Sequence, residues 1–166
     1  TLASIYPGRI DLGLGRAPGT DQLTARALRR NNLDASLHFP NDVKQLQTYF
    51  SKSNSTAMVR AFPGEGLDIP IWILGSSTDS AYLAAQMGLP YTFAAHFAPT
   101  QFRQAIAIYR EHFRPSVYLD KPYVMACVNV LGADTDEEAS ALLSSLIAMF
   151  VGVTTNVRRS EERRVG

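Results

Sequence analysis

The chain has 166 residues, of which 46% are hydrophobic and 10% aromatic, enough apolar material for the core of one soluble globular domain. Sixteen basic and fifteen acidic residues leave a net charge of +1, so the basic excess typical of proteins that bind nucleic acid or anionic membranes is missing. The single cysteine, Cys127, cannot form a disulfide within the chain, which favours a reducing cytoplasmic location. Because no stretch reaches about 18 apolar residues and no signal-peptide pattern opens the chain, we expect no membrane segment.

Hydrophobic periodicity and turn residues predict alternating helices and strands. Pro7-Gly8 stops a short N-terminal helix, Asn41 follows Pro40 as a helix N-cap, and Gly88-Leu89-Pro90 breaks the chain between a helix and a strand. In chain order we expect a helix end (1–6), a strand (9–15), helices (21–30 and 41–52), a strand (70–74), a helix (78–87), a strand (91–95), a helix (100–113), a strand (123–131) and a helix (134–150).

This order of elements is typical of an α/β fold. Strands that alternate with helices favour a parallel sheet with right-handed crossovers. The apolar runs of the later strands agree, because the strands of a parallel sheet are covered on both faces.

The segment Ile71-Trp72-Ile73-Leu74-Gly75-Ser76-Ser77 is a buried strand that ends on two hydroxyls at a helix start. Helix N-termini present unpaired N–H groups and the positive end of the helix dipole, so this turn can hold a phosphate, with Gly75 allowing close approach. The alternative is a capping box, in which Ser76 caps the helix and Asp79 bonds back.

A second segment of similar design is Arg9-Ile10-Asp11-Leu12-Gly13-Leu14-Gly15-Arg16-Ala17-Pro18-Gly19. It is an alternating strand that ends on a glycine and an arginine, and a guanidinium at that end of a strand suits phosphate. A surface or ion-paired role for Arg16 is the alternative.

Other site classes fit the sequence less well. The glycine spacing is GxGxxxG, and no acid follows at the distance that a Rossmann dinucleotide site needs, so that fold is a minor alternative. The sequence holds no Gly-Lys-Ser or Gly-Lys-Thr of a P-loop and no GxSxG of a serine hydrolase. The three histidines are scattered, and no metal site is expected.

The two phosphate-binding segments, extended to Tyr6–Asp21 and joined by Ala84-Ala85 and Gly88-Leu89-Pro90, resemble the bacterial luciferase-like flavin monooxygenases, in particular the alkanal-monooxygenase-like branch. The resemblance covers about residues 1–155. It implies a TIM-type (β/α)8 barrel with FMN at the C-terminal ends of the strands. Such barrels usually need about 250 residues, so we expect a partial barrel of about four consecutive βα units with parallel strands, roughly the fourth to the seventh.

The resemblance also implies which residues bind the cofactor. Arg16 matches the arginine that contacts the FMN phosphate, and Ser77 matches the serine of the second phosphate loop, which Gly75 opens. Ser76 stands where the family pattern has an acid. Ala94 and Ala95 end the next strand, where small residues leave room for the isoalloxazine ring; packing is their alternative role.

No catalytic residue is assigned by this resemblance. His96 is a candidate, because an imidazole at the same rim could donate a hydrogen bond to the flavin or to bound oxygen. A histidine bonded to the neighbouring loop is the alternative. The family's proposed catalytic histidine lies on an early strand and has no counterpart here.

The implied function is that of an FMN-dependent monooxygenase, which oxidises an aldehyde-like or other small organic substrate with O2. Reduced FMN would come from an NAD(P)H:flavin reductase, with a deazaflavin as the second choice of cofactor and a homodimer as one open assembly. The alternative function is a non-catalytic flavin- or phosphate-binding fragment of such a barrel. Residues 156–166 form a charged tail outside the barrel domain of residues 1–155, either foreign or disordered.

Overall fold

The computed structural model describes residues 1–17, 24, 27, 35–96 and 98–155. The chain divides into two compact units, Thr1–Val128 and Asn129–Gly166, and each is described by itself. No helix in these described ranges has both the length and the apolar character needed to cross a membrane. Of the expected helix over 21–30 only residues 24 and 27 are described, and both are helical. The expected tail over 156–166 lies outside the described residues, and the domain boundary at 155 stays a prediction.

The first unit is built on a sheet of four parallel strands in the order β1-β2-β3-β4. Their bounds are Leu12–Gly15 for β1, Ile71–Gly75 for β2, Tyr91–Phe93 for β3 and Val124–Ala126 for β4. The parallel α/β sheet expected from the sequence is thereby confirmed. Because all strands run the same way, their carboxyl ends meet at one edge of the sheet.

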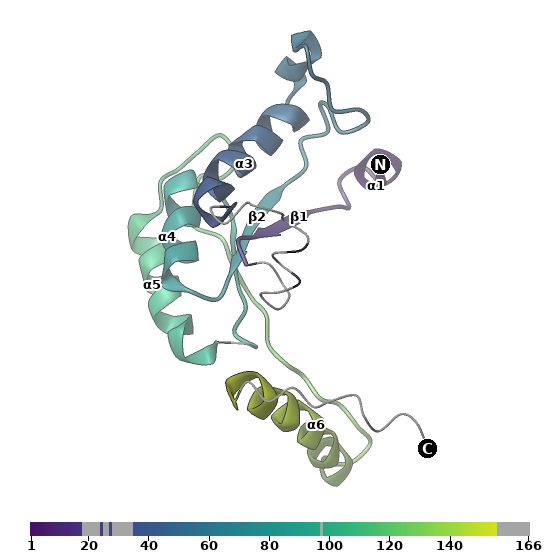
Figure 1. Ribbon diagram of the computed structural model, residues 1–166, viewed down its shortest axis with the longest axis vertical. Helices are drawn as coiled ribbons and strands as arrows, with labels where there is room; N and C mark the ends of the chain where they lie inside the picture. Colours follow the sequence, from purple (N-terminus) through teal and green to yellow (C-terminus); the bar gives the residue numbers. More distant parts are fainter. Residues whose placement is uncertain (18–23, 25–26, 28–34, 97, 156–166) are drawn as a thin grey trace. The chain divides into compact units, whose positions relative to one another are not determined.

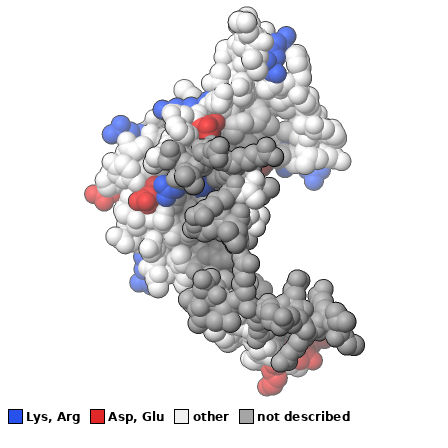
Figure 2. All heavy atoms as spheres, in the orientation of Figure 1, with Lys and Arg blue, Asp and Glu red and all other residues white. Residues whose placement is uncertain are grey.

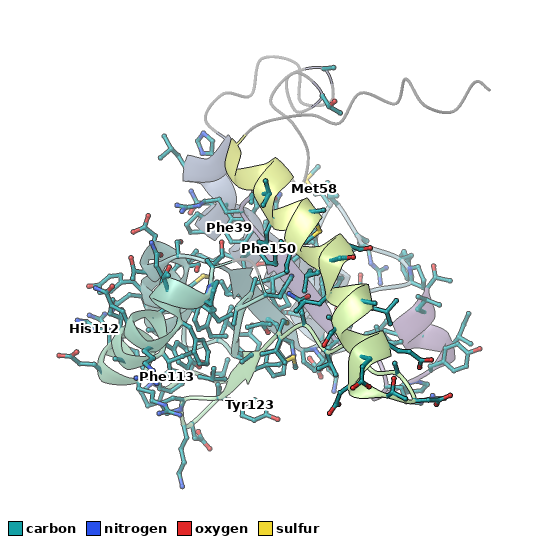
Figure 3. The ribbon with its side chains drawn as sticks, turned by 90° about the horizontal axis from the view of Figure 1, so that it is seen from below. Phe39, Met58, His112, Phe113, Tyr123 and Phe150 are labelled. Carbon is teal, nitrogen blue, oxygen red and sulfur yellow. The ribbon has the colours of Figure 1, made fainter. Side chains whose placement is uncertain are left out.

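Helices cover one face of this sheet. In Figure 1, α3, α4 and α5 lie together on one side of the strands. Helices α4 and α5 are neighbours, and the rings of Tyr82 and His112 lie 5.1 Å apart between them (His112 is labelled in Figure 3). The helices of this unit are α1 (Leu2–Ile5), α3 (Ala35–Phe50), α4 (Thr78–Met87) and α5 (Phe102–His112), with short 3-10 helices η1 (Lys52–Thr56) and η2 (Pro99–Gln101). The second unit contains α6 (Asp136–Thr155).

The core lies between the sheet and these helices. Alternate strand residues point to opposite faces, and the members of β2 and β3 that face the helices are fully or almost fully buried: Ile71, Ile73, Tyr91 and Phe93. Three small residues of α4 bring its backbone close to the strands: Ala81, Ala84 and Ala85. The other face of the sheet carries Leu74, Thr92 and Met125 in register, and Trp72 lies on the same face two residues before Leu74.

One buried hydroxyl joins three elements. Tyr109 of α5 is fully buried, and its hydroxyl donates a hydrogen bond of 2.9 Å to the carbonyl of Leu89. The same oxygen accepts a bond of 3.1 Å from the N–H of Tyr123, just before β4. The break before β3 is made by Gly88, which ends α4 in the left-handed conformation at φ 61°, as expected of a C-cap glycine.

The sequence prediction for α3 was wrong at its start. The helix begins at Ala35, not after Pro40, so Asn41 is not its N-cap and Pro40 lies inside the helix. An interior proline removes one backbone hydrogen bond. Here Phe39 and Val43, one turn apart, both pack into the core, and this burial offsets the loss.

Other boundaries differ by smaller amounts. The strand expected over 123–131 is only Val124–Ala126, because β4 pairs with β3 alone and β3 is three residues long. Helix α5 begins at Phe102 after a 3-10 turn, and α6 extends to Thr155 rather than 150. The expected bounds of α4, 78–87, are confirmed.

Candidate functional site

Two sequence-predicted binding segments come together at the carboxyl edge of the sheet. Strands β1 and β2 are neighbours, and Gly15 is in register with Leu74. Arg16 follows directly after β1, and the Ser76-Ser77 turn follows directly after β2. The Arg16 guanidinium reaches the first turn of α4, where its Nη2 lies 3.6 Å from Oδ2 of Asp79. The structure therefore places an arginine beside a helix N-terminus.

The first turn of α4 is capped by Ser77. Its backbone is extended (φ −132°, ψ 162°), and its Oγ accepts a bond of 3.4 Å from the N–H of Ser80. The capping box of Ser76 with Asp79, the alternative that the sequence offered, is therefore wrong. Asp79 pairs with Arg16 instead, and Ser76 lies exposed one residue before the cap.

Tyr91 supports this helix start, a role the sequence analysis missed. The carbonyl of Ser77 accepts a 2.7 Å bond from Ser80 Oγ and a 3.2 Å bond from the Tyr91 hydroxyl. The two hydroxyls are themselves 3.0 Å apart. Burial raises the pKa of Tyr91, so its hydroxyl stays a proton donor at neutral pH. No local pattern predicts this contact, because Tyr91 belongs to the next strand.

Gly75 is required by the same packing. A Cβ at this position would overlap Oγ and Cβ of Ser80, so only glycine lets the helix start sit over the strand end. The carbonyl of Gly75 accepts a bond of 2.8 Å from the N–H of Ala94, which ties the end of β2 to the end of β3. The turn after β2 is thus held by the packing of Ser80 on one side and by the hydrogen bond to Ala94 on the other.

Arg16, Asp79 and Ser80 also border a pocket of about 120 Å³. Its floor is apolar and includes Phe39 of α3, labelled in Figure 3. The complete lining is Arg16, Phe39, Pro40, Ile73, Leu74, Asp79, Ser80 and Leu83. The arrangement combines one cation with a helix start at the mouth of a small hollow.

The end of β3 carries the remaining predicted residues. Ala94 is 7% exposed, whereas Ala95 packs against the core on the helix side. The N–H of His96 donates a bond of 2.9 Å to the carbonyl of Cys127, so its backbone joins the ends of β3 and β4. The cofactor and catalytic roles of these three residues stay predictions.

Charge near the site is mixed. Figure 2 shows blue and red groups side by side on the coloured part of this face, with no large patch of either sign. The side chains of Arg16 and Asp79 are 45% and 77% exposed, so water screens their attraction. Among the residues that the structure describes, no three His, Cys, Asp or Glu side chains are grouped as metal ligands.

The family of the chain follows from comparison with known proteins. A family model described as luciferase-like monooxygenase matches residues 1–165. The chain belongs to the luciferase-like monooxygenase family. This confirms the family expected from the segments around Arg16 and Ser77 and from the Gly88-Leu89-Pro90 break.

Curated relatives of this luciferase-like protein are closely similar over part of their length. A luciferase-like monooxygenase of Escherichia coli (strain K12) is 50% identical over 161 residues, which cover 97% of this chain and 47% of the relative. The protein YvbT of Bacillus subtilis (strain 168) is 55% identical over 152 residues, 91% of this chain and 45% of the relative. The chain spans about half the length of the curated relatives it matches.

A solved structure shows the same fold. The crystal structure of apo-MsnO8 superposes with a TM-score of 0.79 at 31% sequence identity, covering 93% of this chain and 46% of that chain. The four parallel strands and their helices are therefore a partial (β/α)8 barrel, as expected.

Proposed function

We propose that this luciferase-like protein is an FMN-dependent oxidoreductase that acts as a monooxygenase, using O2 on an aldehyde-like or other small organic substrate. The family supports monooxygenase chemistry. A further relative, the N-acetyl-S-alkylcysteine monooxygenase of B. subtilis, is 35% identical over 56% of this chain and 29% of its own length. The observation that carries the proposal is the Arg16 guanidinium beside the Ser77-capped start of α4.

The donors at this point suit the phosphate of FMN. A dianion favours the positive end of a helix, whose first N–H groups have no partner within the helix. A guanidinium adds charge-assisted bonds with the geometry that phosphate oxygens accept. Ser77 adds a hydroxyl, and Gly75 keeps the approach free of a side chain. The residues present thus fit the phosphate end of the cofactor.

The predicted cofactor-binding residues divide into those that hold the phosphate and those that make room for the ring. Arg16 and Ser77 hold the phosphate, with Ser76 as a second hydroxyl at the rim. Ala94, on the face of the sheet opposite the helices, leaves space for a flat ring, whereas Ala95 is occupied in the core. When bound, reduced FMN supplies the activation of O2. The chain's own groups bind and orient the flavin and keep water from it.

The proposal also includes a source of reduced flavin, a second choice of cofactor and a candidate proton donor. A separate NAD(P)H:flavin reductase would supply reduced FMN, and the cytoplasm would supply both the reductase and a reducing environment. A deazaflavin is the second choice of cofactor. His96 is the residue we would replace first in a search for a proton donor near the ring.

The test is a titration of the purified chain with FMN, followed by flavin fluorescence. Arg16→Ala and Ser77→Ala should each weaken binding, about 10-fold or more for the arginine, because a bond to a charged group is lost. Arg110→Ala and Ser144→Ala, on exposed positions of α5 and α6, are the matched controls. Riboflavin, which lacks the phosphate, should bind the parent chain more weakly than FMN and should be insensitive to Arg16→Ala. Equal loss of riboflavin and FMN binding would refute a phosphate contact.

The second candidate function is a non-catalytic flavin- or phosphate-binding fragment. The observation that favours it is the share of the relatives that this chain spans, 45% of YvbT and 47% of the E. coli protein. FMN binding without aldehyde oxidation, measured with NAD(P)H, O2 and an added flavin reductase, would select it. Oxidation that disappears in Arg16→Ala would select the enzyme.

A further inference from the structure

A second pocket, of about 630 Å³, lies at the amino ends of the middle strands. Its lining includes the segments at which β2 and β3 begin, Asp68–Ile71 and Leu89-Pro90. Because the strands are parallel, these ends lie opposite the edge that carries Arg16 and Ser77. The outer strands of the described sheet, β1 and β4, contribute no lining residue. The volume lies within the range of about 300–1,000 Å³ that is typical of small-molecule sites.

Part of the lining is apolar and aromatic. Leu89 is buried, and Val117 and Tyr118 lie in the segment between α5 and β4. Val117 is 93% exposed and Tyr118 57%, so a ligand in the pocket would cover apolar surface that now faces water. Phe50, the last residue of α3, adds a second aromatic ring. These residues suit an apolar or aromatic group of a ligand.

The rest of the lining is polar and carries one charge of each sign. Lys52 begins the 3-10 helix η1 after α3, and Asp68 lies shortly before β2. The N–H of Gly66 donates a bond of 2.7 Å to the carbonyl of Phe50, which ties the segment before Asp68 to the end of α3. A Cβ at Gly66 would lie 3.5 Å from Cγ of Lys52. The lysine and the aspartate are therefore held in the same part of the pocket.

Both charges are open to a ligand. Lys52 and Asp68 are exposed, and neither forms an ion pair with the other or with any residue that the structure describes. Gln47, Ser51 and Ser53 add an amide and two hydroxyls to the same lining. A carboxylate can accept charge-assisted bonds from Lys52, and an ammonium group can donate them to Asp68. The polar part of the pocket therefore matches a molecule that carries both groups.

We propose that this pocket binds a free α-amino acid with an apolar or aromatic side chain. The carboxylate of the ligand meets Lys52, its ammonium group meets Asp68, and its side chain packs on Phe50 and Tyr118. A zwitterion answers both charges of the lining, whereas a simple acid or a simple amine answers only one. The proposal does not rest on the flavin function, since the two pockets share no lining residue and lie at opposite ends of the strands.

The test is a saturation-transfer NMR titration of the purified chain, without flavin, with L-phenylalanine, phenethylamine and phenylpropionate. Phenethylamine lacks the carboxylate, and phenylpropionate lacks the ammonium group. L-Phenylalanine should bind about 3-fold or more tightly than either, since each loses one exposed charge contact. L-Alanine, which lacks the ring, should bind at least about 10-fold more weakly than L-phenylalanine. Equal affinity of the three ring compounds overturns the proposal, as does the absence of saturable binding of L-phenylalanine.

Two charge variants assign the contacts. Lys52→Gln should abolish the advantage of L-phenylalanine over phenethylamine and keep its advantage over phenylpropionate, because only the carboxylate contact is lost. Asp68→Asn should do the reverse, and asparagine suits the site because Asp68 has φ 45°, a left-handed conformation that asparagine adopts readily. Lys44→Gln and Asp42→Asn, at exposed positions of α3 outside the lining, are the matched controls and should leave both advantages unchanged. Parent-like ligand preference in Lys52→Gln or in Asp68→Asn overturns the proposal.

Discussion

The guanidinium of Arg16 and the carboxylate of Asp79 face each other across the end of β1 and the first turn of α4, with Nη2 and Oδ2 3.6 Å apart. Both side chains are largely exposed, and exposed ion pairs contribute only about 0–1 kcal/mol. The pair therefore keeps the Arg16 guanidinium near the helix start, and the weak attraction leaves Arg16 able to bind another anion. A bound phosphate has to share Arg16 with this acid or replace it.

Asp79→Asn should strengthen FMN binding about 3- to 10-fold, because it removes a negative charge beside the proposed phosphate site and frees Arg16. Asp120→Asn, at an exposed position before β4, is the control and should change nothing. The measurement is the flavin fluorescence titration at low and high salt, since screening should shrink the difference. Weaker binding in Asp79→Asn would show that the acid organises the site.

Gly75→Ala should lower both stability and FMN affinity. The new Cβ overlaps Ser80, which must move away from the Ser77 carbonyl, and overpacking of this kind costs about 1–3 kcal/mol. Urea unfolding measures the loss. Gly13→Ala, where a Cβ finds open space, is the control, and equal stability of the two variants would contradict the role of Gly75.

Tyr91→Phe should lower the free energy of unfolding by about 1 kcal/mol, because the bond from its hydroxyl to the Ser77 carbonyl is lost. Tyr6→Phe, at a residue that is 47% exposed, is the matched control. Urea unfolding of both variants gives the comparison. No difference between them would mean that Ser80 alone fixes the start of α4.

Stability should fall in alkaline solution. Burial raises the pKa of Tyr91 and of Tyr109 above the ordinary value near 10. Above that pH the unfolded chain releases these protons before the folded chain does, so the stabilisation is complete below about pH 10 and is lost as pH rises through the folded pKa values. Urea midpoints between about pH 8.5 and 11 test this. The double variant Tyr91→Phe, Tyr109→Phe should lose less stability over the same range.

Trp72 offers an optical test of the sheet face opposite the helices, since it is the single tryptophan of the chain. It is 8% exposed, its Nε1 donates a 3.0 Å bond to Oδ2 of Asp11, and the ring of Tyr123 packs against it at a tilt of 52°. Tyr123→Ala should expose the indole and shift its emission to longer wavelength. Tyr118→Ala removes an equally exposed tyrosine, 57% in both cases, and should leave the emission unchanged. Identical spectra would show that Tyr123 does not cover the indole.

Much of the fold could be predicted from local patterns alone. The apolar run Ile71–Leu74, the hydroxyls that follow it and Gly88 at the other end of the helix define β2 and α4, because apolar strand runs, N-capping and the left-handed C-cap are short-range effects. Arg16 was assigned to the site from its position at the end of a strand and from the resemblance to the family. The order of strands and helices was enough to predict the parallel sheet.

Contacts between distant elements decided the rest. Ser77 rather than Ser76 caps α4, because Tyr91 of the next strand and Ser80 hold the Ser77 carbonyl in place. Pro40 lies inside α3 because Phe39 reaches the core. The sequence by itself determined where apolar strands and capped helices form, since those depend on neighbours along the chain. Only the tertiary structure decided which serine caps and which acid meets Arg16, because these depend on side chains that folding brings together from separate elements.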